Sequence, residues 1–480
     1  MNAFRHIALG FTFLSVGVTA LFGAPPAQKD SREPVEVSYY RQVRPILQQH
    51  CQGCHQPAKS MGGYVMTSYA ALFDKGNSGE DGVVSGKPHE SKLLAQIVAK
   101  NGKPPAMPKG RDPLLGHDVS LIKDWIAQGA RDDSPPLARQ VVDAEHPPTY
   151  AMPPVITSID YSPDGQILAI AGYHEILLHK ADGSGLLARL IGVSERVQSL
   201  AFSPDGKSLA ATGGDPGRFG EVQIWDVAKR KLRLSLPVTF DTVYGASWSP
   251  DGSKVAFGCA DNTLRAIDAQ SGKQVLYQGA HSDWVLETVF STDASHLVSV
   301  SRDMSMKLTE VPTQRFVDNI TSITPGALKG GLQSVARHPK KDELLIGGSD
   351  GVPKIYKMYR EKKRVIGDDF NLVRAFEGLP GRIFKVRFNV DGSRVVAGSS
   401  FEGRGEVRVY QEADAKLVSK FAGQKGGVYA LAYRPDGKEV ASAGFDGVVR
   451  FNDPSTGKLI RELLPVTLSA TVASAGPGKK

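Results

Sequence analysis

The sequence predicts a multidomain chain, in which a small all-α domain is followed by an all-β propeller of seven blades. Three observations lead to this prediction. The length of 480 residues exceeds what one ordinary core spans. Helical periodicity precedes a proline-rich segment at residues 133–154, and beyond that segment one turn motif recurs at the period of a four-stranded unit. The 51 glycines also favour a turn-rich β architecture.

The first residues have the pattern of a secretory signal peptide, which we assign to residues 1–24. Basic residues precede an apolar run at residues 7–22, and small residues with prolines follow it. Cleavage after Ala20 satisfies both small-residue subsites, and cleavage after Ala24 is the alternative, although Phe22 fits less well there. A retained membrane anchor is the less favoured alternative, because the run is slightly short for a spanning helix. We expect a periplasmic or otherwise exported protein with bacterial-type secretion and no membrane span after cleavage.

Two of the three cysteines lie in a motif with the spacing of covalent haem attachment, Cys51-Gln52-Gly53-Cys54-His55. Two thiols three residues apart can each add to a vinyl group of one porphyrin, and the next residue then lies under the iron. We therefore predict one haem c, bound through Cys51 and Cys54, with His55 as proximal iron ligand. A zinc site would need further ligands at similar spacing, and a thioredoxin-like pair would need a βαβ setting. The sequence shows neither.

A methionine between prolines is the expected sixth ligand of the iron. Met107 lies in Pro104-Pro105-Ala106-Met107-Pro108, where the flanking prolines restrict the backbone. A thioether ligand raises the potential of a haem relative to bis-histidine ligation. The competing ligands are Met61 and Met66, which follow the haem motif too closely to reach the opposite face easily, and His89 and His117, which we place in exposed loops.

Helical signals surround the haem motif. Pro45 suits the first turn of one helix. Ser91 and Asp118 are candidate caps for a second and a third helix, and Gly129 is expected to end the third. The side chains expected to face inward are Ile46 and Leu47 on the first helix, Leu93, Leu94, Ile97 and Val98 on the second, and Val119, Ile122, Trp125 and Ile126 on the third.

Several short segments around the motif match one known domain family. They are Val43-Arg44-Pro45-Ile46-Leu47, Cys51 to His55, Gly62-Gly63, Val83-Val84-Ser85-Gly86-Lys87-Pro88, Ser91-Lys92-Leu93, Met107-Pro108 and Trp125-Ile126. On these segments, residues 35–132 resemble the planctomycete-type cytochrome c domain. The resemblance implies thioether attachment at Cys51 and Cys54, proximal ligation by His55 and distal ligation by Met107. Ser85 stands where such domains often have proline, a departure that leaves the haem ligands untouched.

One unit recurs beyond residues 133–154, which we interpret as a semi-rigid linker. Its turns and their weaker copies carry aspartates at intervals of 41 to 49 residues, the period of a propeller blade. Since each blade has one such aspartate, we interpret these residues as turn formers rather than as a catalytic cluster. The turns are Ser162-Pro163-Asp164-Gly165, Ser203-Pro204-Asp205-Gly206, Ser249-Pro250-Asp251-Gly252 and Arg434-Pro435-Asp436-Gly437, with weaker copies at Asp293, Asp342 and Asp391.

Beyond the second turn and the short strand that follows it, the next strand carries the pair Trp225-Asp226, which is typical of WD repeats. Residues 155–466 therefore resemble a WD-repeat propeller. Most repeats lack this pair and the Gly-His element, for which Ala280-His281 is the nearest approach. Cys259 is expected to be a buried small hydrophobe. We expect residues 467–480 to form a disordered tail.

These features predict an exported c-type cytochrome that transfers electrons through one covalent haem c. A redox partner protein would dock on the propeller or at the haem edge. The net charge of +8 is spread along the chain, so we predict no nucleic-acid partner. The densest basic run, residues 360–364, is interpreted as a solvated loop, with docking of an acidic partner as the alternative.

Two other functions remain open. One is an oxidoreductase of nitrite-reductase-like type, which would pair the cytochrome domain with an eight-bladed propeller holding haem d. The other is a propeller scaffold with the haem as a sensor. The propeller histidines form no visible constellation, so we expect an electron-transfer or binding protein rather than a stand-alone enzyme.

Overall fold

The computed structural model describes residues 36–279, 281–322, 329–365 and 367–469. The expected signal peptide at residues 1–24 lies outside the described residues. From Val37 onward the described residues form one compact unit. Most of its secondary structure is β, and its helices all precede the first strand of the propeller. The prediction of a mainly β second part is confirmed.

Short helices and one small β ladder make up the first part of the chain. The ladder joins β1 (His55–Gln56) and β2 (Lys59–Ser60). The prediction of a purely helical domain is therefore wrong in this detail. The α-helices are α1 (Arg44–His50), α2 (Lys92–Ile97) and α3 (Gly116–Ala127). The shorter helical turns are η1 (Tyr39–Val43), η2 (Met61–Gly63), η3 (Ala70–Phe73), η4 (Gly76–Ser78), η5 (Pro88–Glu90) and η6 (Pro136–Arg139).

Helix α1 begins as the sequence predicts, and α3 ends as predicted. Pro45 lies in the first turn of α1, where its missing N–H costs no hydrogen bond. Gly129 takes a left-handed conformation after α3 (φ 98°), and the next N–H, of Ala130, donates to the carbonyl of Trp125 at 2.8 Å. Asp118 does not cap α3, because the capping position is Leu115 and Asp118 lies in the first helical turn. A carboxylate there still favours the helix dipole.

The prediction that the Ser91 side chain caps α2 is wrong. Ser91 precedes the helix, but its hydroxyl makes no capping bond to it. Instead Ser91 Oγ accepts from the N–H of Val84 at 2.9 Å and donates to the carbonyl of Lys87 at 3.0 Å. A buried serine hydroxyl bonds whichever backbone group lies nearest, and here that is the preceding loop. Val98, expected inside, is exposed because α2 ends before it.

The first part packs around one apolar core. Trp125 lies at its centre, stacked against Tyr39 with ring centroids 5.4 Å apart. The Trp125 indole N–H donates to the carbonyl of Arg131 at 2.9 Å, which satisfies its polar end. The other buried members are Val43, Ile46, Leu47, Met66, Leu72, Val83, Leu93, Leu94, Ile97, Leu114, Ile122, Ile126 and Ala130.

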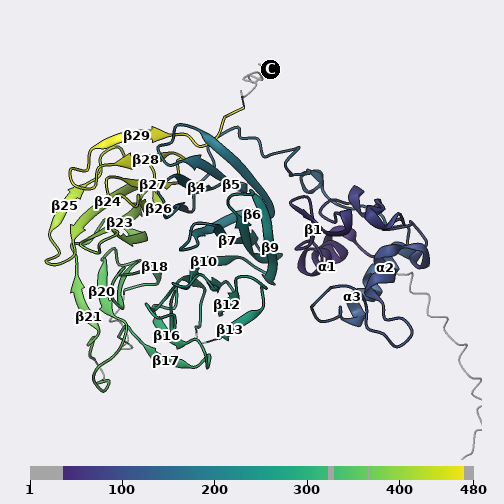
Figure 1. Cartoon of the computed structure of the whole chain (residues 1–480), viewed down its shortest axis with the longest axis horizontal. Helices are drawn as coiled ribbons and strands as arrows, with labels where there is room; N and C mark the ends of the chain where they lie inside the picture. Colours follow the sequence, from purple (N-terminus) through teal and green to yellow (C-terminus); the bar gives the residue numbers. More distant parts are fainter. Residues whose placement is uncertain (1–35, 280, 323–328, 366, 470–480) are drawn as a thin grey trace, which may run out of the picture. The chain divides into compact units, whose positions relative to one another are not determined.

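The strands from β3 onward form antiparallel sheets that follow one another around a ring (Figure 1). The first sheet has seven strands, β3 (Ile159–Tyr161), β4 (Ile167–Ala171), β5 (Tyr173–Lys180), β6 (Leu186–Phe202), β7 (Ser208–Asp215), β8 (Phe219–Asp226) and β9 (Lys231–Thr239). The next two have four strands each: β10 (Val243–Trp248), β11 (Lys254–Cys259), β12 (Leu264–Asp268) and β13 (Gln274–Gln278), then β14 (Val285–Phe290), β15 (His296–Ser301), β16 (Met306–Glu310) and β17 (Phe316–Asn319).

Three further four-stranded sheets complete the described part of the ring. They are β18 (Leu332–Arg337), β19 (Glu343–Gly348), β20 (Lys354–Lys357) and β21 (Leu372–Ala375); β22 (Arg382–Phe388), β23 (Arg394–Phe401), β24 (Arg404–Gln411) and β25 (Leu417–Lys420); and β26 (Val428–Tyr433), β27 (Val440–Gly444), β28 (Val449–Asn452) and β29 (Leu459–Leu463).

The recurrent aspartates form turns, as predicted. Asp251 accepts from the hydroxyl of Ser249 at 2.5 Å and from the N–H of Ser253 at 3.0 Å. These bonds to the ionised form lower the pKa of Asp251 to about 2. Asp342 departs from the pattern, since it accepts from the N–H of Thr292 at 2.8 Å and so joins the turns of two neighbouring sheets.

A buried hydrogen-bond network supports the third sheet. It is centred on His281, the residue at which the sequence comes nearest to the Gly-His element of WD repeats. His281 Nδ1 lies 2.9 Å from Asp303 Oδ2, and its Nε2 lies 2.7 Å from Ser299 Oγ. Asp303 Oδ1 accepts from the N–H of Ser305 at 3.0 Å. The aspartate that closes a strand therefore bonds the next tight turn, as the sequence indicates.

The first and last sheets of the ring pack directly on each other. The N–H of Ile156 donates to the carbonyl of Gly444 at 3.0 Å. Arg461 of β29 donates to the carbonyl of Asp182, in the turn between β5 and β6, at 2.7 Å. The shared core contains Ile156, Ile159, Tyr161, Leu168, Ile170, Leu177, Ala181, Ala430, Ala432, Ala441, Ala443, Val449 and Phe451.

The second half of the predicted linker is bonded to the propeller, and the start of the predicted tail is bonded to that linker. The carbonyl of Pro148 accepts from Arg189 at 2.7 Å, and the hydroxyl of Tyr150 donates to Glu175 at 2.6 Å. Residues 467–469 do not begin a free tail, because Leu468 forms a parallel bridge with Tyr150. The rest of the predicted tail lies outside the described residues.

Candidate functional site

The four predicted haem residues line one cavity in the first part of the chain. Its volume is about 420 Å³, and Cys51, Cys54, His55 and Met107 all contribute to its wall. Most of the remaining wall is apolar. It includes Tyr64, Met66, Leu93, Ile97 and Pro237.

The end of α1 positions the two thiols. The N–H groups of Cys51 and Gln52 both donate to the carbonyl of Leu47 at 2.9 Å, which ends the helix. The chain then turns tightly, and the N–H groups of Cys54 and His55 donate to the carbonyl of Cys51 at 3.1 Å. This turn directs both cysteines and the histidine to one cavity.

Hydrogen bonding sets the orientation of the His55 imidazole. Its Nδ1 lies 3.1 Å from the carbonyl oxygen of Tyr64. A carbonyl only accepts, so Nδ1 carries the hydrogen and Nε2 keeps a free lone pair. Such a bond fixes the tautomer and the ring plane of a histidine that ligates a metal.

A tyrosine supports this histidine from the side. The Tyr64 ring meets the His55 ring edge-on with centroids 5.9 Å apart, and its hydroxyl donates to the carbonyl of Leu72 at 2.7 Å. Gly82 leaves room for it, because a Cβ there would lie 2.2 Å from the Tyr64 hydroxyl oxygen. The imidazole is therefore held by main chain and packing together.

Three methionines line the cavity, and they differ in burial and in support. Met107 is partly buried, and its N–H donates to the carbonyl of Gln96 on α2 at 3.0 Å. Met66 is buried at 2% exposure and belongs to the core, whereas Met61 is half exposed. His89 and His117 are exposed and do not line the cavity, but they do not lie in loops as expected, because His89 belongs to η5 and His117 to the first turn of α3.

The three cysteines form no disulfide with one another and differ in environment. Burial raises the pKa of Cys51 to about 12, and Cys54 is exposed. Cys259, at the end of β11, is fully buried as predicted, and burial raises its pKa to about 12.

Charged side chains also line the cavity. They are Lys75, Lys92, Lys109, Arg111 and Glu80. Lys92 pairs with Glu80. Lys109 and Arg111 are both exposed, and we call this solvent-facing, positively charged part of the wall the rim.

Sequence reasoning missed the contribution of the propeller to this region. Pro237 of β9 lines the haem cavity, and a Cβ on Gly53 would lie 2.7 Å from the carbonyl oxygen of Ser235. The glycine inside the motif is thus needed for close approach of two backbones. No local pattern marks such a contact between residues so far apart in the chain.

The basic run at residues 360–364 is only partly solvated. Arg360 bonds Asp368 at 3.2 Å and Asp318 at 3.3 Å, and Arg364 bonds Asp318 at 2.8 Å. The two arginines thus pair within the protein.

The described ranges contain neither a clustered metal site nor a membrane-spanning helix. No group of three or more His, Cys, Asp or Glu side chains is arranged to hold a metal ion there. No helix among the same residues is long and apolar enough to cross a membrane.

Family models match both parts of the chain. The model of planctomycete cytochrome c matches residues 51–110. The model of the WD domain, G-beta repeat, matches residues 185–218, 231–268 and 415–453. The chain therefore contains WD repeats in a β-propeller fold, and its haem-motif region is similar to planctomycete cytochrome c.

Curated proteins resemble the chain through its repeats. The WD repeat-containing protein 26 homolog of Arabidopsis thaliana is 22% identical over 343 residues, which cover 70% of this chain and 53% of that protein. Eukaryotic translation initiation factor 3 subunit I of Candida glabrata is 24% identical over 272 residues, which cover 53% of this chain and 65% of that protein. The chain thus spans about half to two thirds of the length of these relatives.

Proposed function

We propose that this chain is an exported c-type cytochrome that transfers electrons through one covalent haem c and docks a redox partner protein. The observation that carries the proposal is that both cysteines, His55 and Met107 line one cavity with a largely apolar wall. Its volume of about 420 Å³ lies within the usual range of cofactor sites. A haem bound there would supply one-electron chemistry at its iron.

The residues of the chain fit this group. Cys51 and Cys54 would hold it by thioether bonds, and the free Nε2 of His55 would be the proximal donor. The apolar wall excludes water and limits reorganisation around a changing charge, which tunes the potential. Met107 is the proposed distal donor, because its loop is tied to α2 through Gln96.

The number of blades favours a propeller that docks a partner protein over the eight-bladed propeller of the nitrite-reductase-like alternative. Strand β6 pairs with β5 over its first half and with β7 over its second half. We infer that the seven-stranded sheet is two blades joined through β6, which with the five four-stranded sheets gives seven blades. The nitrite-reductase-like alternative would require eight.

The rim of the cavity fits an acidic redox partner. Lys109 and Arg111 are exposed beside it, where they would steer a negatively charged surface toward the haem edge. Charge reversal with Lys109→Glu and Arg111→Glu should slow electron exchange with an acidic redox protein and weaken its salt dependence. Unchanged rates in stopped-flow absorbance would contradict docking at this edge.

One face of the propeller offers a second docking surface. Trp284 is 37% exposed, stacks on Tyr244 with centroids 5.8 Å apart, and has Arg302 4.6 Å from its ring centre. Aromatic and arginine side chains are enriched in interface cores. Trp284→Ala should abolish capture of a partner from native extract. Val390→Ala, in the exposed turn between β22 and β23, should not, and equal capture by both variants would argue against this surface.

A redox titration followed by absorbance tests the electron-transfer proposal. Purified protein, made with haem-maturation machinery, should show c-type haem bands that shift on reduction and follow a one-electron curve. Protein without such bands, or with bands that do not respond to reductant, would overturn the proposal.

A further inference from the structure

A carboxyl group of the propeller lies beside the wall of the haem cavity. Pro237 of β9 lines that cavity, and Glu221 of β8 is its direct cross-strand partner. Side chains of directly opposed residues in antiparallel strands lie on the same face of the sheet, with Cβ atoms about 5 Å apart. Glu221 is therefore a close neighbour of the cavity, although it is far from the haem motif in the sequence.

Hydrogen bonds connect this carboxyl group to the haem motif. The amide nitrogen of Gln56, the residue after His55, donates to Ser235 Oγ at 3.1 Å. The Ser235 hydroxyl in turn donates to Glu221 Oε1 at 3.2 Å. Since an amide nitrogen only donates, the hydroxyl hydrogen of Ser235 is free to point to the carboxyl group. A single serine side chain thus links the haem motif to Glu221.

Glu221 is a buried acid among neutral polar side chains. Its exposed fraction is 0%. Burial raises the pKa of Glu221 to about 7, and contacts with Gln223, Ser235 and Ser194 offset only part of that rise. The carboxyl group can therefore gain or lose a proton near neutral pH, where an ordinary glutamate stays ionised.

None of the titratable side chains on the elements around Glu221 acts on its carboxyl group in the described part of the chain. They are Arg44 and His50 on α1, His55 on β1, Lys59 on β2, Arg189, Glu195 and Arg196 on β6, Asp215 on β7, Asp226 on β8, Lys231 and Arg233 on β9, and Tyr244 on β10. Several are bonded elsewhere: Asp215 pairs with Arg218 at 3.3 Å, and Lys59 donates to the carbonyl of Arg233 at 3.1 Å.

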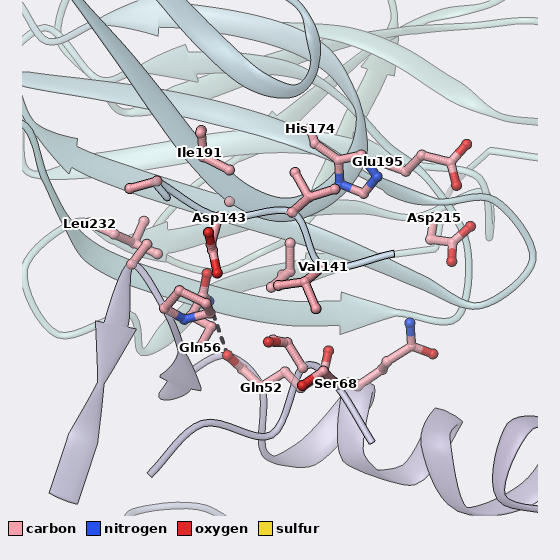
Figure 2. Close-up of a pocket in the computed structure, with 18 of the residues that line it drawn as sticks. Gln52, Gln56, Ser68, Val141, Asp143, His174, Ile191, Glu195, Asp215 and Leu232 are labelled. Carbon is pink, nitrogen blue, oxygen red and sulfur yellow. Dashed lines mark hydrogen bonds between the residues drawn. The ribbon is translucent and has the colours of Figure 1, made fainter. Parts of the chain in front are cut away.

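The charges of a second cavity lie away from this chain of hydrogen bonds. The cavity has a volume of about 630 Å³, and Gln52 and Gln56 lie along one side of it, joined by a bond of 3.0 Å from the Gln56 amide to the Gln52 carbonyl (Figure 2). Glu195 and Asp215 lie at the other end of the view, and His174 lies on the opposite wall (Figure 2). Burial lowers the pKa of His174 to about 4, so this imidazole is neutral at neutral pH. A change of charge at the haem would therefore act on Glu221 with little competition.

We propose that Glu221 is coupled to the haem, so that it releases a proton to water when the haem gives up one electron and regains the proton when the haem is reduced. This inference rests on the proposed function. The electron passes to the redox partner, and the O–H bond of the carboxyl group breaks. The extra positive charge of the oxidised iron favours the carboxylate, whereas the reduced state favours the neutral acid. The propeller thus changes its internal charge with the redox state of the haem.

Potentiometric titration of the full-length holoprotein at a series of pH values tests the coupling. Glu221→Gln replaces the acid by a neutral group of the same shape. The midpoint potential of the unaltered protein should equal that of Glu221→Gln in acid and fall below it as the pH rises from about 6 to about 8, because ionised Glu221 stabilises the oxidised state. A difference that stays constant with pH would refute the coupling, whereas a lack of c-type haem bands would refute the proposed function itself.

Asp160→Asn is the matched control. Burial also raises the pKa of Asp160, to about 6, but this residue lies on β3, whose residues do not line the haem cavity, and it accepts from the N–H of Phe202 at 2.8 Å. The variant should keep the pH dependence of the unaltered protein. Equal loss of that dependence in Asp160→Asn and Glu221→Gln would show a general effect of charge and would contradict the assignment to Glu221.

Infrared difference spectroscopy provides a second readout, which does not depend on the size of the potential shift. The reduced-minus-oxidised spectrum near neutral pH should contain a C=O band of a protonated carboxyl group. This band should be missing in Glu221→Gln and remain in Asp160→Asn. Identical difference spectra for the unaltered protein and Glu221→Gln would rule the coupling out.

Discussion

Three methionines line the proposed haem site, and they differ as candidates for the distal iron ligand. Met61, Met66 and Met107 all line the cavity, but only Met107 combines partial burial with a loop tied to α2. Replacement of a thioether by imidazole lowers a haem potential, so Met107→His should shift the midpoint potential downward. Met61→Leu should leave both the potential and the spectrum unchanged. Redox titration of the two variants checks this, and the opposite pattern would assign the ligand to Met61.

Asp303 shows how one carboxylate supports a blade. Burial alone would raise the pKa of Asp303, but hydrogen bonds from His281 and Ser305 hold it below its usual range. Its stabilisation is therefore complete above the ordinary carboxyl pKa of about 4 and is lost as the pH falls below that value. We expect Asp303→Asn to lower the free energy of unfolding by about 1–3 kcal/mol at neutral pH, and by less in acid. Denaturation by urea at both pH values measures this difference, which would stay constant with pH if the account were wrong.

At the scale of elements, the haem motif and strand β9 approach each other through Gly53. A methyl group at this position would lie 2.7 Å from the Ser235 carbonyl oxygen and 3.1 Å from Pro237 Cδ. Gly53→Ala should therefore lower the melting temperature while leaving the two cysteines and His55 free to hold haem. Gly116→Ala is the matched control, because nothing lies within 4 Å of its added methyl group at the start of α3. Calorimetry that found equal stability of both variants would contradict the close approach.

Features that depend on a few neighbouring residues could be recognised from the sequence. The spacing of Cys51, Cys54 and His55 and the turns built on Asp251 and its equivalents are of this kind. The cap at Ser91 was predicted wrongly, because a hydroxyl can bond any nearby backbone group and the loop at Val84 lies closer.

Contacts between distant segments could not be predicted from the sequence. The approach of Gly53 to Ser235 depends on how the two parts of the chain pack, as does the cavity between Gln56 and His174. Neither contact leaves a periodic pattern, since each involves single residues far apart in the chain.

At the scale of the whole molecule, packing between the first and last sheets closes the ring. Phe451 is fully buried in the core that these sheets share. Phe451→Ala should lower the free energy of unfolding by about 3–5 kcal/mol, because it leaves a cavity in that core. Phe445→Ala, in an exposed position of the same sheet region, should change it by less than about 0.5 kcal/mol. Similar losses in chemical denaturation for both variants would show that ring closure does not depend on this core.

Covalent attachment of haem is the central claim for the molecule as a whole, and intact mass spectrometry tests it most directly. Full-length protein made with haem-maturation machinery and then denatured should be heavier than the polypeptide by one haem. The variant with both Cys51→Ala and Cys54→Ala should have the bare polypeptide mass. A bare mass for the unaltered protein under the same conditions would contradict the account.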